Sequence, residues 1–394
     1  MTIETSLNLD QQKGSPRFIR NVLIKTLLFF LLCNVSFALA NATEWLGRLS
    51  AYNVVLPGRD RLPWSENPNV AYSLSLNNLD AMFASHVIAE ADKPKSEFRV
   101  LVIGDSSTWG FLLPVEDTLT ENINRSGLIT ADGKQVKAYN LGYPTISLTK
   151  DLLLLDYALR YEPDLILWLV TLEAFPSKKQ IFTSLVQNNP RPITNLINTY
   201  GLMIDPINEE FIHPTFWENT IVGQRRPLAD LLRLQLYGVM WAATGIDQDI
   251  KEDYELRQAD FEVDDSFYDY VVPELSVDSL AFDVIAAGIQ RAGSVPVFVI
   301  NEPIFISSGE NSDIRYNFMY PRWAYDSYRR LMFEYSNANS LFYLDLWNAI
   351  PSYEFTNTAI HITPLGTAQL SALVGQAIID LANGDFTSSN GAKD

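Results

Sequence analysis

A serine follows directly after an apolar run in the first half of the chain. Gly104, Asp105, Ser106 and Ser107 come after the run 98–103, which reads FRVLVI. A buried strand that ends in such a turn places side chains at the carboxyl edge of a sheet, where α/β proteins collect catalytic groups. Glycine permits a tight turn and aspartate caps a following helix. The pattern therefore predicts that Ser106 presents a nucleophilic hydroxyl above that edge.

A serine hydroxyl needs a base to take its proton, and histidine suits that task near neutral pH. The chain has three histidines. His86 lies in a helix-like segment and His213 in an irregular one, so we expect structural or surface roles for both. His361 lies on a loop between a strand-like run and a helical run over 367–381. We therefore predict that His361 is the base for Ser106.

These two blocks resemble the nucleophile motif and the late histidine of the SGNH, or GDSL-type, serine hydrolases. The run 138–144, AYNLGYP, is similar to the second block of that family. The resemblance covers 98–381 with one interruption. It implies a three-layer α/β/α sandwich with a parallel, flavodoxin-like sheet, and ester hydrolysis or acyl transfer as the reaction. It also implies an oxyanion hole formed by the backbone N–H groups of Ser106 and Gly142, each donor being worth about 3 kcal/mol.

Two positions depart from the family pattern, and the first concerns the oxyanion hole. The third family block supplies an asparagine after a strand, whereas here the strand-like run 165–170 leads into Thr171. Thr171, or Asn301 at the end of a later strand, is the candidate for the missing donor. Polar residues near the same edge are candidates for substrate binding, namely Asp105, Glu173, Glu302 and Arg315.

The second departure concerns the acid that orients the histidine. The family has an aspartate three residues before it, whereas this chain has Thr358, preceded by Asn357. Either side chain can hold the imidazole tautomer by a hydrogen bond, but neither carries the full charge that stabilises an imidazolium. Glu354 and Asp345 are alternative carboxylates that a loop could bring close. The residues leave these alternatives open.

The composition of the chain excludes several classes of partner and cofactor. The chain has 394 residues and a net charge of -18, which argues against partners that are nucleic acids or acidic membrane surfaces. No zinc pattern, calcium loop or phosphate-binding loop is visible, so we expect neither metal nor cofactor. The single cysteine, Cys33, excludes an intrachain disulfide. The oligomeric state stays open.

The N-terminal part, 1–43, has a basic flank and an apolar stretch. Arg17, Arg20 and Lys25 precede and enter the apolar run 22–42. Basic residues hold the start of such a segment in the cytoplasm, so the rest of the chain is expected outside it. Sites resembling signal-peptidase sites occur at 38–42, and the stretch is at the short limit for a spanning helix. Both a transmembrane anchor, which we favour, and a cleaved signal fit these features.

The remaining chain divides into a leader over 44–97, an α/β domain over 98–385 and a disordered tail over 386–394. Strands are predicted at 98–103, 137–141, 165–170, 295–300 and 341–346, separated by helix-length intervals. A largely helical insertion, about 176–277, interrupts the domain. Its apolar helix over 228–244 has a face that fits core, lid or partner surface, with core as the default expectation. Its acidic stretch over 247–269 is expected to be a solvated linker. We predict that the insertion forms part of a pocket wall or a lid.

Two functions fit the sequence. The first is a membrane-tethered serine esterase or O-acyltransferase outside the cytoplasm, which acts on acyl esters of small molecules, glycans or lipids. The second is a noncatalytic glycan-binding or envelope-assembly protein on the same fold, since two family residues are missing. A lipase with a lid is a weaker third hypothesis, because nothing in the sequence indicates a large acyl pocket.

Overall fold

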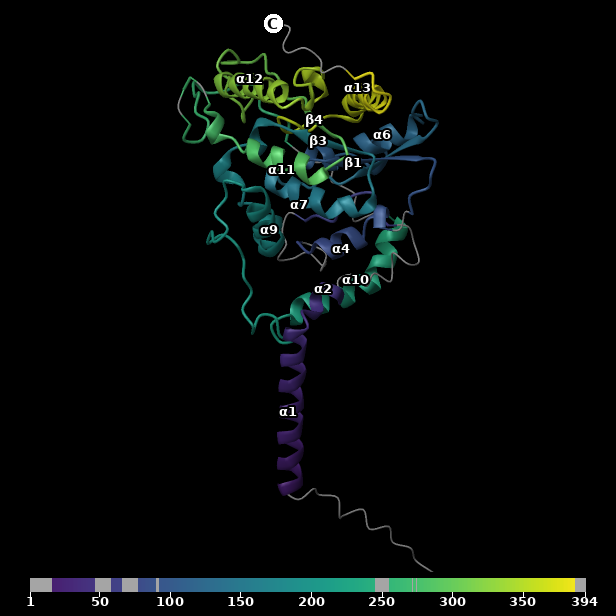
Figure 1. Cartoon of the computed structure of the whole chain (residues 1–394). Helices are drawn as coiled ribbons and strands as arrows, with labels where there is room; N and C mark the ends of the chain where they lie inside the picture. Colours follow the sequence, from purple (N-terminus) through teal and green to yellow (C-terminus); the bar gives the residue numbers. More distant parts are fainter. Residues whose placement is uncertain are drawn as a thin grey trace, which may run out of the picture.

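The computed structural model describes residues 16–46, 58–65, 77–89, 92–244, 255–270, 272–273 and 275–386. Five parallel strands form one sheet in the order β2-β1-β3-β4-β5 (Figure 1). They are β1 (Glu97–Ile103), β2 (Gln135–Asn140), β3 (Leu165–Val170), β4 (Val297–Asn301) and β5 (Phe342–Asp345). This is the strand order of flavodoxin-like folds. The predicted strands are all present, with small shifts at their ends.

Helices cover both faces of the sheet. One face packs against α7 (Leu148–Ala158), α11 (Phe282–Ala292) and α12 (Arg322–Ala338), and the other against α6 (Leu119–Arg125) and α13 (Pro364–Ala382). Side chains of a strand alternate between faces, so Leu101 and Ile103 belong to the first core, and Val100 and Val102 to the second. Because both faces are buried, the strands read as continuous apolar runs. The predicted three-layer sandwich is confirmed.

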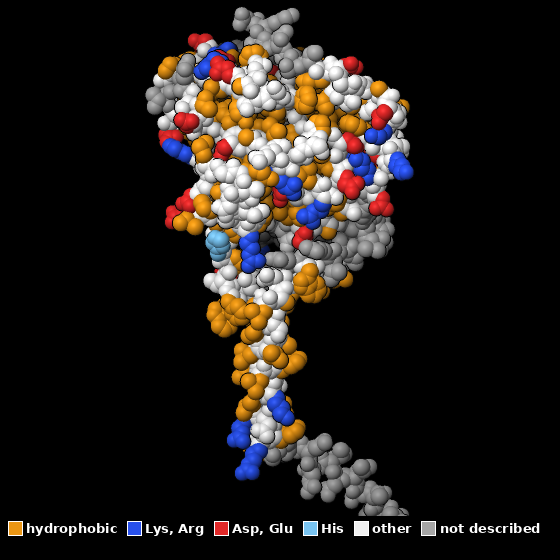
Figure 2. Space-filling view, in the orientation of Figure 1, with side chains coloured by type: hydrophobic (Ala, Val, Ile, Leu, Met, Phe, Trp, Pro, Cys, Tyr) orange, Lys and Arg blue, Asp and Glu red, His pale blue; other side chains and the backbone are white. Residues whose placement is uncertain are grey.

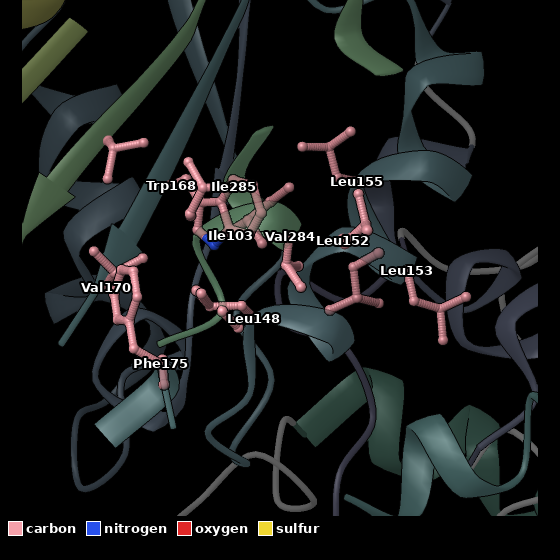
Figure 3. Packing of buried hydrophobic residues seen from close by; sticks show 14 of the residues in the cluster. Ile103, Leu148, Leu152, Leu153, Leu155, Trp168, Val170, Phe175, Val284 and Ile285 are labelled. Atoms are coloured by element: carbon pink, nitrogen blue, oxygen red, sulfur yellow. The ribbon is translucent and has the colours of Figure 1, made fainter. Parts of the chain in front are cut away.

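Trp168 of β3 fills the centre of the first core, beside Ile103, Leu148 and Ile285 (Figure 3). Its indole nitrogen donates to Asp151 Oδ2 at 3.1 Å. A side chain at Gly288 of α11 would bring its Cβ within 2.4 Å of the Trp168 ring. The glycine therefore allows α11 to lie directly on the sheet.

The insertion contains α8 (Ser184–Gln187), α9 (Pro190–Tyr200) and α10 (Arg225–Thr244). The expectation that the apolar face of α10 is core is wrong. Leu231 is buried, but Leu232 and Leu236 are 67% and 75% exposed. The reason is position, because α10 starts near the upper end of α1 and runs obliquely along the lower side of the domain, at its periphery (Figure 1).

The acidic stretch is not a free linker where the structure describes it. Over 255–270 it packs against the loops at the carboxyl edge of the sheet. Arg257 N–H donates to Thr356 O at 3.1 Å, and the Asn311 amide donates to Phe261 O at 2.6 Å. Aromatic side chains and backbone hydrogen bonds thus hold this segment despite its charge. Residues 245–254 lie outside the described residues.

Two described helices, α1 (Pro16–Leu39) and α13, are long and apolar enough to cross a membrane by length and composition alone. The most apolar window of α13 is 39% buried, and this helix packs on the sheet as a core helix. The corresponding window of α1 is 11% buried, and α1 projects from the domain (Figure 1). The N-terminal segment therefore has the form of an anchor or signal helix.

Parts of the leader pack beneath the site. Arg61, 1% exposed, donates to Gly110 O at 3.0 Å and Leu113 O at 2.7 Å. Its guanidinium lies 4.6 Å from the centroid of the Trp109 ring. The predicted tail lies, from 387 on, outside the described residues.

Candidate active site

The fold brings Ser106 and His361 together although most of the domain separates them along the chain. Ser106 begins the short helix α5 (Ser106–Trp109), which follows β1 directly. His361 lies on the loop that enters α13. Ser106 Oγ lies 2.8 Å from His361 Nε2, a hydrogen-bond distance. In this geometry a neutral imidazole accepts the serine proton.

Asn357 holds the other side of the imidazole. His361 Nδ1 lies 2.9 Å from Asn357 Oδ1. Because an amide oxygen accepts, it places the imidazole proton on Nδ1 and leaves Nε2 as acceptor for Ser106. Thr358 has a different role, since its Oγ1 accepts the backbone N–H of His361 at 3.1 Å and that of Ile360 at 3.3 Å. Of the two candidates, Asn357 orients the ring and Thr358 orders the loop.

The alternative carboxylates are engaged elsewhere. Glu354 accepts a hydrogen bond from the Thr363 hydroxyl at the start of α13. Asp345 accepts from Asn301 Nδ2 at 2.8 Å and from Arg329 Nε at 2.9 Å. Among the described residues no carboxylate is hydrogen-bonded to the imidazole. The site is therefore a Ser–His–Asn chain of hydrogen bonds.

Asn301 is a structural residue, and its prediction as an oxyanion donor is wrong. Its amide nitrogen donates to Asp345, while its oxygen accepts from Tyr328 at 3.2 Å and Tyr325 at 3.4 Å. The side chain is fully buried. A buried amide beside strand β5 and helix α12 satisfies its polar atoms there and leaves none at the site.

Gly142 is a glycine because two backbones meet there. A Cβ at this position would lie 2.4 Å from Trp109 N, so a side chain would push α5 away. The Gly142 N–H already donates to Asn140 Oδ1 at 3.0 Å. The prediction that it stabilises an oxyanion therefore does not hold in this structure.

Two predicted oxyanion donors remain. The backbone N–H of Ser106 begins α5, and the first N–H groups of a helix have no partner within it. The Thr171 hydroxyl is fully buried and accepts from the Tyr320 hydroxyl at 3.0 Å. Ser106 N–H is therefore the stronger candidate, and the role of Thr171 stays a prediction.

Lys150, which the sequence reasoning missed, lies beneath the nucleophile turn. This fully buried lysine at the start of α7 donates from Nζ to Gly104 O at 2.7 Å and to Tyr143 O at 3.3 Å. Its Nζ also lies 2.5 Å from Asp151 Oδ1. Lys150 thus joins the nucleophile turn to the loop after β2. A Lys–Asp pair at the start of an otherwise apolar helix was the available signal.

Asp105 and Glu302 complete this buried charge cluster. Asp105 caps α5 by accepting the Ser107 N–H on Oδ1 at 2.8 Å. Burial raises the pKa of Asp105 to about 6, against the opposing effect of the Lys150 charge. Burial and the Asp105 charge raise the pKa of Glu302 well above its usual range. Both residues are buried. Asp105 has a structural role as the cap of α5, whereas the two Glu302 carboxyl oxygens are buried without a hydrogen-bond partner in the described part of the chain. The contact of these residues with substrate stays a prediction.

The other two substrate-binding candidates connect the insertion to the domain. Glu173 accepts hydrogen bonds from Lys179 Nζ and the Tyr268 hydroxyl. Arg315 is 7% exposed, and its N–H groups donate to the backbone carbonyls of Asp264, Ser266, Asn317 and Phe318. The prediction that Arg315 binds substrate is therefore wrong, because backbone carbonyls occupy the guanidinium.

The surroundings of His361 favour its neutral form. The Phe111 ring lies 4.9 Å from the imidazole between centroids, and the side chain is 7% exposed. Burial disfavours the imidazolium and lowers the pKa of His361 to about 4. His361 is therefore available as a base from mildly acidic pH upward.

The pH profile follows from this pKa. A base works when deprotonated, so kcat/KM for an ester is expected to rise through about pH 4 and to stay level across neutral pH. Steady-state rates from pH 3.5 to 8 in buffers of constant ionic strength test this. An acidic limb at the ordinary histidine value of about 6.5 would contradict a buried, neutral His361.

Replacing the oriented amide with a carboxylate gives a second test. Asn357→Asp adds a charge 2.9 Å from Nδ1, which stabilises the imidazolium formed when Ser106 loses its proton. We expect kcat/KM to rise by about 10-fold and the acidic limb to move to higher pH. Thr358→Asp is the matched control, since Thr358 bonds the backbone instead of the ring. An equal response of both variants would contradict the assignment of Asn357.

No protein-family model and no curated protein sequence matches the chain. Solved structures resemble it at low identity. A G-D-S-L family lipolytic protein from Desulfitobacterium hafniense DCB-2 is 11% identical, with a TM-score of 0.33, over 71% of this chain and 98% of that one. A carbohydrate acetylesterase family member from Sinorhizobium meliloti is 11% identical, with a TM-score of 0.32, over 73% and 99%.

A lipase/acylhydrolase from Enterococcus faecalis is 15% identical, with a TM-score of 0.34, over 74% of this chain and 99% of that one. The three descriptions name the class of hydrolase that the sequence motifs resemble. The TM-scores are too low to carry an argument. The assignment of function therefore rests on the strand order and the geometry of the site.

Proposed function

We propose that the protein is an SGNH-type serine esterase or O-acyltransferase that acts on acyl esters of glycans or lipids. The observation that carries this proposal is the hydrogen-bonded chain of Ser106, His361 and Asn357, with distances of 2.8 Å and 2.9 Å. In this chain the partly exposed Ser106 hydroxyl, just after β1, is hydrogen-bonded to His361, and Asn357 fixes the tautomer of the His361 imidazole. Acyl transfer requires this combination of nucleophile and oriented base.

The reaction follows from the positions of these groups. Ser106 Oγ attacks the acyl carbonyl while its proton passes to His361 Nε2. The Ser106 backbone N–H donates to the oxyanion of the tetrahedral intermediate. The imidazolium then protonates the departing alkoxide, which leaves the acyl group on Ser106. Water, or a sugar hydroxyl, next attacks the acyl carbonyl while its proton passes to His361. The imidazolium returns that proton to Ser106 Oγ as the acyl–Ser106 bond breaks, so hydrolysis and transfer share the same site.

The N-terminal helix supports a location outside the cytoplasm. Arg17, Arg20 and Lys25 lie at the start of α1, and the domain follows its other end. Basic residues at the start of a spanning helix stay in the cytoplasm. We propose that α1 is retained as an anchor, which would place the site on the outer side of the membrane. Cleavage after α1 would release a secreted enzyme.

Specific features favour the noncatalytic alternative. Asn357 stands where the family has a charged residue, and the Gly142 N–H donates to Asn140 rather than toward the site. A protein with these losses can bind an acylated glycan without turning it over. Direct measurement of serine reactivity separates the two functions.

The test is labelling of the full-length chain in nanodiscs with a fluorophosphonate probe. This probe reacts much faster with a serine that a neighbouring base activates than with an ordinary serine. We expect labelling that peptide mapping places on Ser106 and that Ser106→Ala abolishes. Ser107→Ala is the matched control, because Ser107 is its neighbour in the same helix and should leave labelling unchanged. A folded wild-type chain that takes no label would favour the binding protein.

A further inference from the structure

The lower side of the domain carries exposed apolar side chains that begin next to α1 and continue along α10. Phe216, Trp217 and Val222 precede α10, and Leu232, Leu236 and Met240 lie along it; these six residues are called the apolar base. Trp217 is 71% and Leu236 75% exposed. Orange side chains gather at the upper end of the projecting helix and along the adjoining underside of the domain (Figure 2). A soluble surface seldom exposes large apolar groups together in this way.

Helix α10 separates its apolar side chains onto two faces. Leu231 and Gly238 are buried against the domain. Leu232, Leu236 and Met240 are spaced four residues apart, so they form one stripe on a face directed away from it. The helix therefore has one face that is buried against the protein and an apolar face that is exposed.

The depth of α1 in a membrane identifies the partner. The Val222 N–H donates to Asn34 Oδ1 at 3.2 Å, and Asn34 and Ala38 are buried. The rise from Pro16 to Asn34 is about 27 Å at about 1.5 Å per residue, less than a hydrocarbon core of about 30 Å. If α1 spans the bilayer, Asn34 therefore lies inside the hydrocarbon core, near its outer boundary. The segment that contacts Asn34 must then enter the outer leaflet.

Polar residues gather around Asn41, seven residues beyond Asn34. A cavity of about 260 Å³ is lined by Asn41, which follows the end of α1, and by Arg191 and His213, with further asparagines and prolines. The apolar segment that contacts Asn34 through Val222 thus precedes the polar residues near Asn41 along the direction of α1, which is the order of acyl chains and headgroups. Trp217 is also the residue type that membrane interfaces favour.

We propose that the apolar base inserts into the outer lipid leaflet and seats the catalytic domain on the bilayer. This inference rests on the retention of α1 as an anchor, which is part of the proposed function. A seated domain holds its active site at a set height above the lipid instead of moving freely on a tether. Its substrates would then be acyl esters presented at the membrane surface.

The experiment measures lipid contact residue by residue in the full-length chain. In a Cys33→Ser background, single cysteines replace Trp217, Leu236 or Leu365, and each carries an environment-sensitive fluorophore. Leu365 is the matched control, because it is 60% exposed on α13, at the far end of the domain from α1. The chains are placed in phosphatidylcholine nanodiscs, one per disc, with or without lipids that carry a quenching spin label.

We expect spin-labelled lipid to reduce emission about twofold or more at positions 217 and 236, and to leave position 365 unchanged. Either test position behaving like 365 would overturn the proposal. The mass of the purified chain reports separately whether α1 is retained, and fluorophosphonate labelling reports separately on Ser106. Circular dichroism identifies any cysteine variant that fails to fold.

Discussion

Ser106→Ala and His361→Ala are each expected to lower kcat/KM for a soluble ester by about 10³–10⁵-fold. The two side chains act as one unit, since the proton that leaves Ser106 Oγ crosses the 2.8 Å to His361 Nε2 in the step that forms the bond. The loss corresponds to about 4–7 kcal/mol of transition-state stabilisation. Turnover of p-nitrophenyl acetate by full-length variants, compared with wild type, measures it.

The double variant provides the sharper form of this prediction. Because either change alone removes the nucleophile or its base, Ser106→Ala with His361→Ala should lose about as much rate as one change. Losses that multiply would mean that the residues act independently. Ser107→Ala is expected to keep wild-type activity, and thermal unfolding should show that all variants are folded. Equal turnover by wild type and Ser106→Ala would refute the proposed nucleophile.

Lys150→Met is expected to lower the free energy of unfolding by about 3–5 kcal/mol. The change removes the donor to Gly104 O and Tyr143 O, and leaves Asp151 without its cation in a fully buried site. Activity should fall as well, since the carbonyl that Nζ holds belongs to the nucleophile turn. Urea denaturation of the full-length chain in detergent, followed by fluorescence, measures the loss.

The pH dependence identifies the cause of that loss. Burial already raises the pKa of Asp151 and of Asp105, and the Lys150 charge opposes the rise. Without the cation their folded-state pKa values rise further, so keeping them ionised costs more as the pH increases. The destabilisation should therefore grow from pH 5 to pH 8. Lys134→Met is the control, because its partner Asp132 is exposed, and its effect should stay below about 0.5 kcal/mol. A loss independent of pH would indicate packing instead of charge.

Local signals in the chain were sufficient to predict the sheet and the hydrogen-bonded pair of Ser106 and His361. The apolar runs that form the five strands are buried on both faces, which makes them visible without tertiary information. Ser106 follows one such run, and His361 is one of only three histidines. Parallel strands connected by crossovers bring their carboxyl ends to one edge, so this pairing could be expected from chain order.

The neighbours of the reacting pair could not be predicted in this way. Asn357 and Thr358 are adjacent and both polar, and only the turn of the loop decides which one faces the imidazole. Asn301 was expected to be available as an oxyanion donor and Arg315 for substrate, because a sequence does not distinguish a free polar side chain from a buried one that already has partners. Their partners lie on β5, on α12 and in the acidic segment, far along the chain.

By itself, the sequence determined the fold class, the serine and histidine at the sheet edge, and the apolar N-terminal helix, because each depends on residue type and on near neighbours. Tertiary structure alone decided that Asn357 orients the histidine, that Lys150 supports the nucleophile turn, and that the apolar face of α10 is exposed. Each of these depends on which distant segments meet, and on the burial that their meeting creates. Burial also sets the pKa values at the site, and thereby the conditions under which Ser106 can react.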